Sequence, residues 1–183
     1  MLPERTDDGA QVTSAGFRKV THKSFTLPDG NVFTADVAGV DGSSAAAIIA
    51  LTPQGEVVIA RQFRFGPEKM MDELPGGLVD AGETPQQAAE RELKEETGYV
   101  ARNISYLGKV YVDAWDNTEH HYFLGTDCEQ VAGPTPEDDE NIEVALITVE
   151  ELIENAYEGR MTDVSAVLMG HTQLQQFKQR EDT

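Results

Sequence analysis

The sequence contains one cysteine, few basic residues and no long apolar segment. Cys128 is alone among the 183 residues, so no disulfide can form within the chain, and we expect an intracellular, cytoplasmic protein. The longest apolar run, Ala45 to Leu51, has the length of a strand and falls far short of the ~20 residues that cross a bilayer. The N-terminus, MLPERTDDGAQ, has no basic start followed by an apolar stretch. Neither a secretory signal nor a membrane anchor is therefore expected.

Positive charge is also scarce. Only 14 Lys and Arg oppose 33 Asp and Glu, which gives a formal net charge of −19. Because this charge repels a phosphate backbone, we do not expect binding to nucleic acid. A small phosphorylated ligand stays compatible, since a bound divalent metal can reverse the sign of a local site. The stretch from Asp127 to Glu158 holds 11 acids and no Lys or Arg, which indicates either a solvated surface or a cation site.

Local patterns predict a mixed chain of strands and helices. Residues 17–27 and 31–37 are predicted to form a hairpin around a Pro-Asp-Gly turn, while residues 1–15 are expected to be frayed. Further strands are predicted at 45–51, 56–65, 72–74, 104–112, 120–125 and 142–147. Helices are predicted after Thr84, Thr148 and Thr162.

The helix predicted at residues 84–98 carries a concentration of acids. Glu92, Glu95 and Glu96 stand at positions i, i+3 and i+4, so they share one face. Like charges this close destabilise a helix unless something cationic offsets them. Oxygen ligands with no cysteine or histidine nearby suit a hard cation, Mg²⁺ or Mn²⁺. The alternative is an exposed acidic helix whose charges pair with neighbouring basic residues.

The segment that contains this helix resembles the Nudix box, Gx5Ex7REUxEExGU, in which U is a bulky apolar residue. Every defined position is matched, by Gly77, Glu83, Arg91-Glu92-Leu93, Glu95-Glu96 and Gly98-Tyr99. The resemblance implies an α/β (α+β) protein with the Nudix fold, an α/β/α sandwich with a mixed sheet, plus an N-terminal β-hairpin region. It implies two parts: residues 1–40, a tail and hairpin swapped in a homodimer, and residues 41–183, the Nudix hydrolase domain.

The resemblance also implies roles for the box residues. Glu92 and Glu96 look like the main metal carboxylates, with Glu95 beside them as a ligand or a supporting acid. The carbonyl of Gly76 resembles the backbone ligand of the family. Arg91 looks like the residue that pairs with a box glutamate and orients it. The implied cofactor is Mg²⁺, with Mn²⁺ as a substitute.

Hydrolysis of a diphosphate also needs a general base for the attacking water. In related enzymes the base is a box glutamate or a glutamate on a loop beyond the sheet. The acidic segment 136–143 resembles such a loop, and Glu140 is our first choice because it lies just before the next predicted strand. Asp139, Glu137 and the box glutamates stay open as alternatives.

The region before the box bears on the substrate. The hairpin, the Arg61-Gln-Phe-Arg64 sequence and Glu73 resemble the ADP-ribose pyrophosphatases and related nucleotide-sugar hydrolases. We therefore expect Arg61, Arg64, Glu73 and Trp115 to contact a small nucleotide-sugar substrate. An arginine such as Arg64 can bind two phosphate oxygens at once, and a tryptophan can stack on a base.

One departure from that group concerns a proline that usually follows the box. No proline occurs between Pro85 and Pro134 in this chain. ADP-ribose, GDP-mannose and other nucleotide sugars therefore stay open as substrates. A non-catalytic sensor of such a nucleotide is the alternative from a different functional class.

Overall fold

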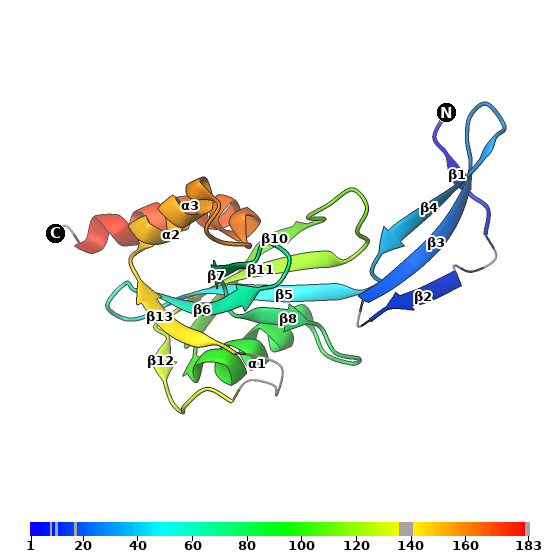
Figure 1. Cartoon of the computed structure of the whole chain (residues 1–183). Coiled ribbons are helices and arrows are strands. Elements are labelled where there is room, and N and C mark those ends of the chain that lie inside the picture. Colours follow the sequence, from blue (N-terminus) through cyan, green and yellow to red (C-terminus); the bar gives the residue numbers. More distant parts are fainter. Residues whose placement is uncertain (8, 10, 17, 136–140, 182–183) are drawn as a thin grey trace. The chain divides into compact units, whose positions relative to one another are not determined.

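The computed structural model describes residues 1–7, 9, 11–16, 18–135 and 141–181. Figure 1 shows the order of its elements. The strands are β1 (Glu4–Arg5), β2 (Gln11–Ala15), β3 (Arg18–Thr26), β4 (Val32–Ala38), β5 (Ser44–Leu51), β6 (Val57–Arg64), β7 (Lys69–Glu73), β8 (Gly76–Leu78), β9 (Tyr99–Val100), β10 (Asn103–Val110), β11 (Glu119–Thr126), β12 (Glu129–Gln130) and β13 (Glu143–Ile147). The helices are α1 (Pro85–Thr97), α2 (Val149–Glu158) and α3 (Val164–Glu181).

Two compact units are present. The first consists of Met1–Ser44 with Tyr111–His120, and the second of Ala45–Val110 with the described residues from His121 onward. The division into parts at residues 40 and 41 stays a prediction. The unit observed extends to Ser44 and includes a second stretch of chain, 111–120.

The first unit is built on the long strand β3. Strand β4 pairs with it antiparallel, from Val20↔Ala38 to Thr26↔Val32, which confirms the predicted hairpin. A segment between β10 and β11 joins the unit, where the Ala38 N–H donates to the carbonyl of Trp115 over 2.7 Å.

The expectation that residues 1–15 are frayed is wrong for those described. Strands β1 and β2 pair antiparallel with the two ends of β3, on the edge that β4 leaves available. Backbone pairing is reinforced by side chains, since Arg5 donates to Asp41 over 2.7 Å and Thr13 Oγ1 lies 2.9 Å from His22 Nε2. A polar tail gains these bonds only because an unpaired strand edge lies next to it.

The second unit contains a seven-stranded sheet of order β10-β11-β5-β6-β13, in which β7 also pairs with β6 and β8 with β5. Strands β5 and β6 pair with each other at Ala50↔Val58 and Leu51↔Val57. Beyond that point β6 pairs with β7, and β5 pairs with β8 at Ala47↔Gly76. The chain therefore crosses from one strand to the other between β7 and β8, just before the glycines of the box.

Helices cover both faces of this sheet (Figure 1). On one face, α1 contributes Ala88, Ala89 and Leu93 to a core with Ala46, Ile48, Ala50 and Val58. On the other face, α2 and α3 contribute residues such as Leu152 and Leu174 to a core with Ile49, Leu51, Val57 and Ile59. The expected α/β/α sandwich with a mixed sheet is thereby confirmed.

The boundaries of α1 follow the predicted caps, whereas the last helix begins at Val164, after the Thr162 that was predicted to open it. Thr84 Oγ1 accepts from the Gln87 N–H at 3.3 Å, and the Gln87 side chain reciprocates, which completes the capping box of α1. Gly98 ends α1 with φ of 76°, and an added Cβ there would lie 2.1 Å from the Ala132 carbonyl oxygen. Both the backbone conformation and the close contact therefore require glycine. Among the helices described, none has the length and apolar character needed to cross a membrane.

Candidate active site

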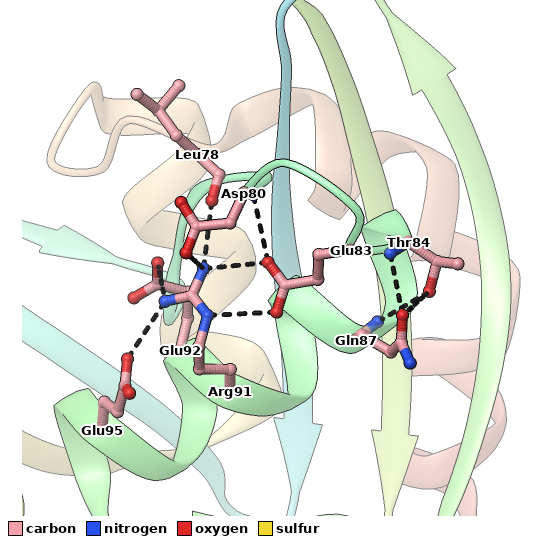
Figure 2. A network of polar contacts seen from close by, with 8 residues as sticks. All are labelled: Leu78, Asp80, Glu83, Thr84, Gln87, Arg91, Glu92 and Glu95. Carbon is pink, nitrogen blue, oxygen red and sulfur yellow. Dashed lines mark hydrogen bonds and ion pairs between the residues drawn. The ribbon is translucent and has the colours of Figure 1, made fainter.

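Arg91 lies at the centre of the acidic face of α1 (Figure 2). Its Nε and Nη2 donate to the two oxygens of Glu83 over 3.1 and 3.2 Å. Its Nη1 donates to Glu92 Oε1 over 2.8 Å and to Glu95 Oε2 over 3.0 Å. The hydrogen bonds that Arg91 donates to Glu83 do most to raise the pKa of Arg91 above its usual range. Arg91 in turn lowers the pKa of Glu83. One guanidinium therefore holds three carboxylates, a set that we call the Arg91 network.

Two glycines make room for the other carboxylates of the face. The Gly76 N–H donates to Oε2 of the buried Glu96 over 3.0 Å. A Cβ added to Gly77 would lie 2.3 Å from Glu92 Oε1, and one added to Gly76 would lie 2.5 Å from the Ala46 carbonyl oxygen. At Gly77 a side chain would displace the Glu92 carboxylate, and at Gly76 the neighbouring strand β5 leaves no room for one.

The donor set suits a divalent cation. Glu83, Glu92, Glu95 and Glu96 carry four negative charges against the single positive charge of Arg91, and all donors are oxygens, as Mg²⁺ and Mn²⁺ prefer. In the described part of the chain, no three His, Cys, Asp or Glu side chains already converge as metal ligands. Arg91 and the Gly76 N–H hold the carboxylates instead. Glu92, Glu95 and Glu96, with the backbone of Gly76, are the groups that would hold the ion.

Arg64 joins this side of the sheet through Glu73. The buried Glu73 carboxylate accepts from Arg64 Nε over 2.5 Å and from Arg64 Nη2, and Gln62 Nε2 adds a bond of 3.3 Å. Glu73 does most to raise the pKa of Arg64, with smaller effects from the nearby Glu96 and Asp163. A half-exposed cation is thus held near the box carboxylates.

Arg61 lies on the opposite face of the sheet from Arg64. Adjacent strand residues point to opposite faces, and Arg61 follows Val57 and Ile59, which belong to the core beneath α2 and α3. Its Nε donates to Asp72 Oδ1 over 2.6 Å, and Asp72 also accepts from Asn155 of α2 over 2.7 Å. The structure does not bring Arg61 together with the box carboxylates. Its assignment as a substrate contact stays a prediction.

Two other predicted residues, Trp115 and Glu140, are not tested by the structure as parts of this site. Trp115 belongs to the first unit, where its side chain is 55% exposed, and its contact with substrate stays a prediction. Glu140, together with Glu137 and Asp139, lies outside the described residues. Cys128 is buried, and burial raises the pKa of its thiol to about 12, so it does not provide a nucleophile.

A cavity of about 450 Å³ opens beside the Arg91 network. Its lining consists of Arg91, Lys94, Glu95, Ala132, Gly133 and Thr135. Thr135, the last described residue before the acidic segment, donates its N–H to the Glu95 carbonyl over 2.6 Å. The chain that leads to the predicted base therefore runs along α1 at the level of Glu95.

Sequence reasoning missed Asp163 and Asn155. Asp163 accepts from the Leu74 N–H over 3.2 Å, and Asn155 bonds to Asp72. An aspartate just before a helix is easily taken as a cap. Whether such an aspartate caps its own helix or binds a distant backbone N–H depends on the tertiary contact, which no local sequence pattern reveals.

Comparison with known proteins agrees with this geometry. The NUDIX domain profile matches residues 42–166. An ADP-ribose pyrophosphatase of Bacillus subtilis strain 168 is 29% identical over 154 residues, covering 83% of this chain and 82% of that protein. A GDP-mannose pyrophosphatase of Yersinia enterocolitica is 28% identical over 137 residues, covering 70% and 71%.

A solved structure supports the fold independently. The crystal structure of an ADP compounds hydrolase superposes with a TM-score of 0.76 at 20% identity, over 96% of this chain and 95% of that one. At this identity the likeness concerns the fold alone. The profile match spans more than half of the chain and contains the complete box with its carboxylates and glycines. The chain therefore belongs to the Nudix hydrolase family.

Proposed function

We propose that the protein hydrolyses the diphosphate bond of ADP-ribose or a related nucleoside diphosphate sugar, giving a nucleoside monophosphate and a sugar phosphate, with Mg²⁺ as its cofactor. The observation that carries the proposal is a surplus of carboxylate at α1: three acids of the helix and Glu83, just before it, stand against Arg91, with the cation Arg64 held near them. The relatives named for ADP-ribose and GDP-mannose support a nucleotide sugar as the substrate class.

The chain's own residues contribute position and charge. When bound, a divalent cation neutralises the diphosphate, and the hydrolysis then depends mostly on electrostatics and orientation. Arg64 binds a phosphate oxygen with the part of its guanidinium that Glu73 leaves available. Arg91 keeps Glu92 and Glu95 in place while the site is empty of ligand, and so limits the repulsion within the face.

Glu140 is the proposed general base, with Glu137, Asp139 and the box glutamates as competitors. Support comes from the residues that flank the acidic segment on each side. Thr135 bonds to the backbone of Glu95, and Glu143 begins β13 next to β6, with its carboxylate 3.8 Å from Arg61 Nη1. Both flanks lie in the unit that carries the box.

The decisive test replaces one buried carboxylate of the box. Glu96→Gln keeps the size of the side chain and the bond from Gly76, but removes the charge that a cation requires. We expect turnover to fall by at least about 100-fold with the melting temperature of the metal-free protein nearly unchanged or raised. Glu90→Gln is the matched control, because Glu90 is an exposed residue of the same helix and, among the described residues, bonds only to Gln86. Equal activity in both variants would refute the assigned site.

The same assay ranks the substrates. Phosphate-containing products are measured with Mg²⁺ or Mn²⁺ and a panel of ADP-ribose, GDP-mannose and other nucleotide sugars. Hydrolysis of GDP-mannose in preference to ADP-ribose would favour the alternative substrate that the missing proline leaves open. Tight binding without turnover of any member would favour a non-catalytic sensor.

The proposal includes a homodimer formed through residues 1–40 and a cytoplasmic location. The dimer is supported by apolar side chains that the first unit leaves exposed, including Val12, Val32 and Phe33. The location is supported by the single, buried cysteine.

A further inference from the structure

The turn between β7 and β8 is fixed at each successive residue. Its partners come from β6, β5 and α1 and from Asp163, the residue just before α3. Glu73 accepts from Arg64 of β6, and the Leu74 N–H donates to Asp163. The Pro75 carbonyl accepts from the Ile48 N–H of β5 over 3.0 Å, and the Gly76 N–H donates to Glu96 of α1. This turn, residues 73–76, carries the chain across the gap between β5 and β6 to the box glycines. The position of Gly76 relative to the box carboxylates depends on it.

Asp163 is the partner that nothing above assigns to the reaction. It directly precedes α3, and its Oδ2 accepts from the Leu74 N–H over 3.2 Å and from Thr162 Oγ1 over 3.1 Å. Both donors lie outside α3, so the side chain does not act as a helix cap in the usual way. The residue is partly exposed as a whole, but its carboxyl group is enclosed, and burial raises its pKa to about 6.

The charges around Asp163 belong to the candidate active site. Glu73 of β7 and Arg64 of β6 face it. The charge of Glu73 raises the pKa of Asp163, and the charge of Arg64 lowers it. Tyr122 of β11 faces it from the core, and burial raises the pKa of that phenol. Arg64 thus lies among three carboxylates, those of Glu73, Glu96 and Asp163.

An enclosed carboxylate that is mostly ionised at neutral pH lowers the stability of the fold. An asparagine would accept the same bond from Leu74 without a buried charge. A residue that served only the stability of the turn would therefore be better neutral, whereas groups that work at an active site are often retained against stability.

We propose that Asp163 is a positioning residue for the hydrolysis, whose carboxylate fixes the Leu74–Gly76 backbone and the Arg64 side chain relative to Glu96. The inference rests on the proposed function. The negative charge strengthens the bond from the Leu74 N–H and attracts the Arg64 guanidinium. Asp163 touches neither substrate nor metal.

Asp163→Asn and Asp163→Ala test the proposal together. The first variant keeps an acceptor for Leu74 and removes the charge; the second removes both. At pH 7.5 we expect metal-free Asp163→Asn to melt at a higher temperature than the unaltered protein, yet to show a kcat about 10-fold lower, because displacement of a catalytic group by a fraction of an ångström is costly. Asp163→Ala should lower kcat further and accelerate hydrogen exchange of the Leu74 amide.

The control is Asp127→Asn, the same change at an exposed turn with φ of 52°, which asparagine adopts readily. This control substitution should change neither kcat nor the melting temperature. An Asp163→Asn protein with unchanged kcat would overturn the proposal. So would a fall of kcat and melting temperature together, since Asp163 would then serve stability alone.

Binding of Mn²⁺ by calorimetry separates this inference from the proposed function. If the unaltered protein hydrolyses no nucleotide sugar, the proposed function fails. In that case the affinity for Mn²⁺ decides the role of Asp163. Affinity about 10-fold weaker in Asp163→Asn would support positioning of the ligand set, and unchanged affinity would refute it.

Discussion

Two arginine–carboxylate networks lie on opposite faces of the central sheet. The Arg91 network beside α1 joins one guanidinium to Glu83, Glu92 and Glu95. On the α2 face, Asp72 accepts from Arg61 and Asn155, and Asn155 Oδ1 accepts from Arg160 Nε over 2.8 Å. We call this second set the Asp72 network.

The two networks use the same chemistry and differ in charge balance. In the Asp72 network, the one buried acid is bonded by Arg61 and by the Asn155 amide, so both its oxygens have partners, and with Arg160 as a second cation no acid is in surplus. In the Arg91 network a single arginine serves three acids, and Glu96 adds a fourth close by. A balanced network stabilises the fold, whereas an unbalanced one retains repulsion that a cation can relieve. Excess charge, not ion pairing as such, marks the functional face.

Gly77→Ala should break the Arg91 network most severely. The new methyl group would lie 2.3 Å from Glu92 Oε1, so the carboxylate must leave its position. We expect kcat to fall by about 100-fold, the usual result of displacing a catalytic group by an ångström. Steady-state hydrolysis with saturating Mg²⁺ measures this.

Gly66→Ala is the control for that substitution. Gly66 has no atom within 4 Å of an added Cβ and no strained φ. The Gly66→Ala protein should therefore be as active as the unaltered protein. A Gly77→Ala protein as active as Gly66→Ala would mean that the position of Glu92 does not matter for turnover.

Asp72→Asn should break the Asp72 network and leave the other intact. The change removes the charge that Arg61 needs and places two amide groups against each other at Asn155. We expect the free energy of unfolding to fall by about 3 kcal/mol with kcat altered less than about 3-fold. Urea denaturation and the hydrolysis assay report the two quantities separately.

Glu143→Gln serves as the comparison on the same arginine. Glu143 approaches Arg61 at 3.8 Å but its side chain is 68% exposed, so the loss should be within about 0.5 kcal/mol. A large loss of kcat in Asp72→Asn would instead place Arg61 in the substrate site, as the sequence predicts, and would contradict the division between the two faces.

The last prediction concerns Asp163 and the change of its effect on stability with pH. The pKa of its carboxyl is about 6 in the folded protein against an ordinary value of 3.8. Between these values the folded state binds more protons than the unfolded state, so this group lowers stability as pH rises from about 4 to about 6. Asp163→Asn should therefore be most stabilising above pH 7, by less than about 3 kcal/mol, and should lose that advantage near pH 4. Thermal unfolding across this range measures it; an advantage independent of pH would contradict the raised pKa.

Much of the fold was predictable because its signals are local. The N-cap Thr84, with Gln87, and the C-terminal Gly98 mark the two ends of α1, and the turn sequence at residues 28–30 predicts the β3–β4 hairpin. The strands β1 and β2 were not predictable. Their residues carry no strong pattern, and they pair because β3 offers an unpaired edge. The acidic residues proposed as base, including Glu140, lie outside the described residues, so their assignment stays a prediction.

The contrast between Arg61 and Arg64 defines the limit of sequence reasoning for the site. Their spacing places them on opposite faces of a strand. Which face meets α1 depends on the packing of helices that are distant in sequence. Asp163 was missed for the same reason, since 89 residues separate it from its partner Leu74.

The sequence by itself determined the helix α1, the spacing of its carboxylates and the glycines that accompany them. These depend on helical periodicity and on backbone sterics, which act over a few residues. Tertiary structure alone decided that Arg64 lies on this face of the sheet while Arg61 lies on the other, and that Asp163 reaches the turn before Gly76. Those relations depend on how β5 and β6 separate and on which helices cover each face, and such long-range packing has no local signature in the chain.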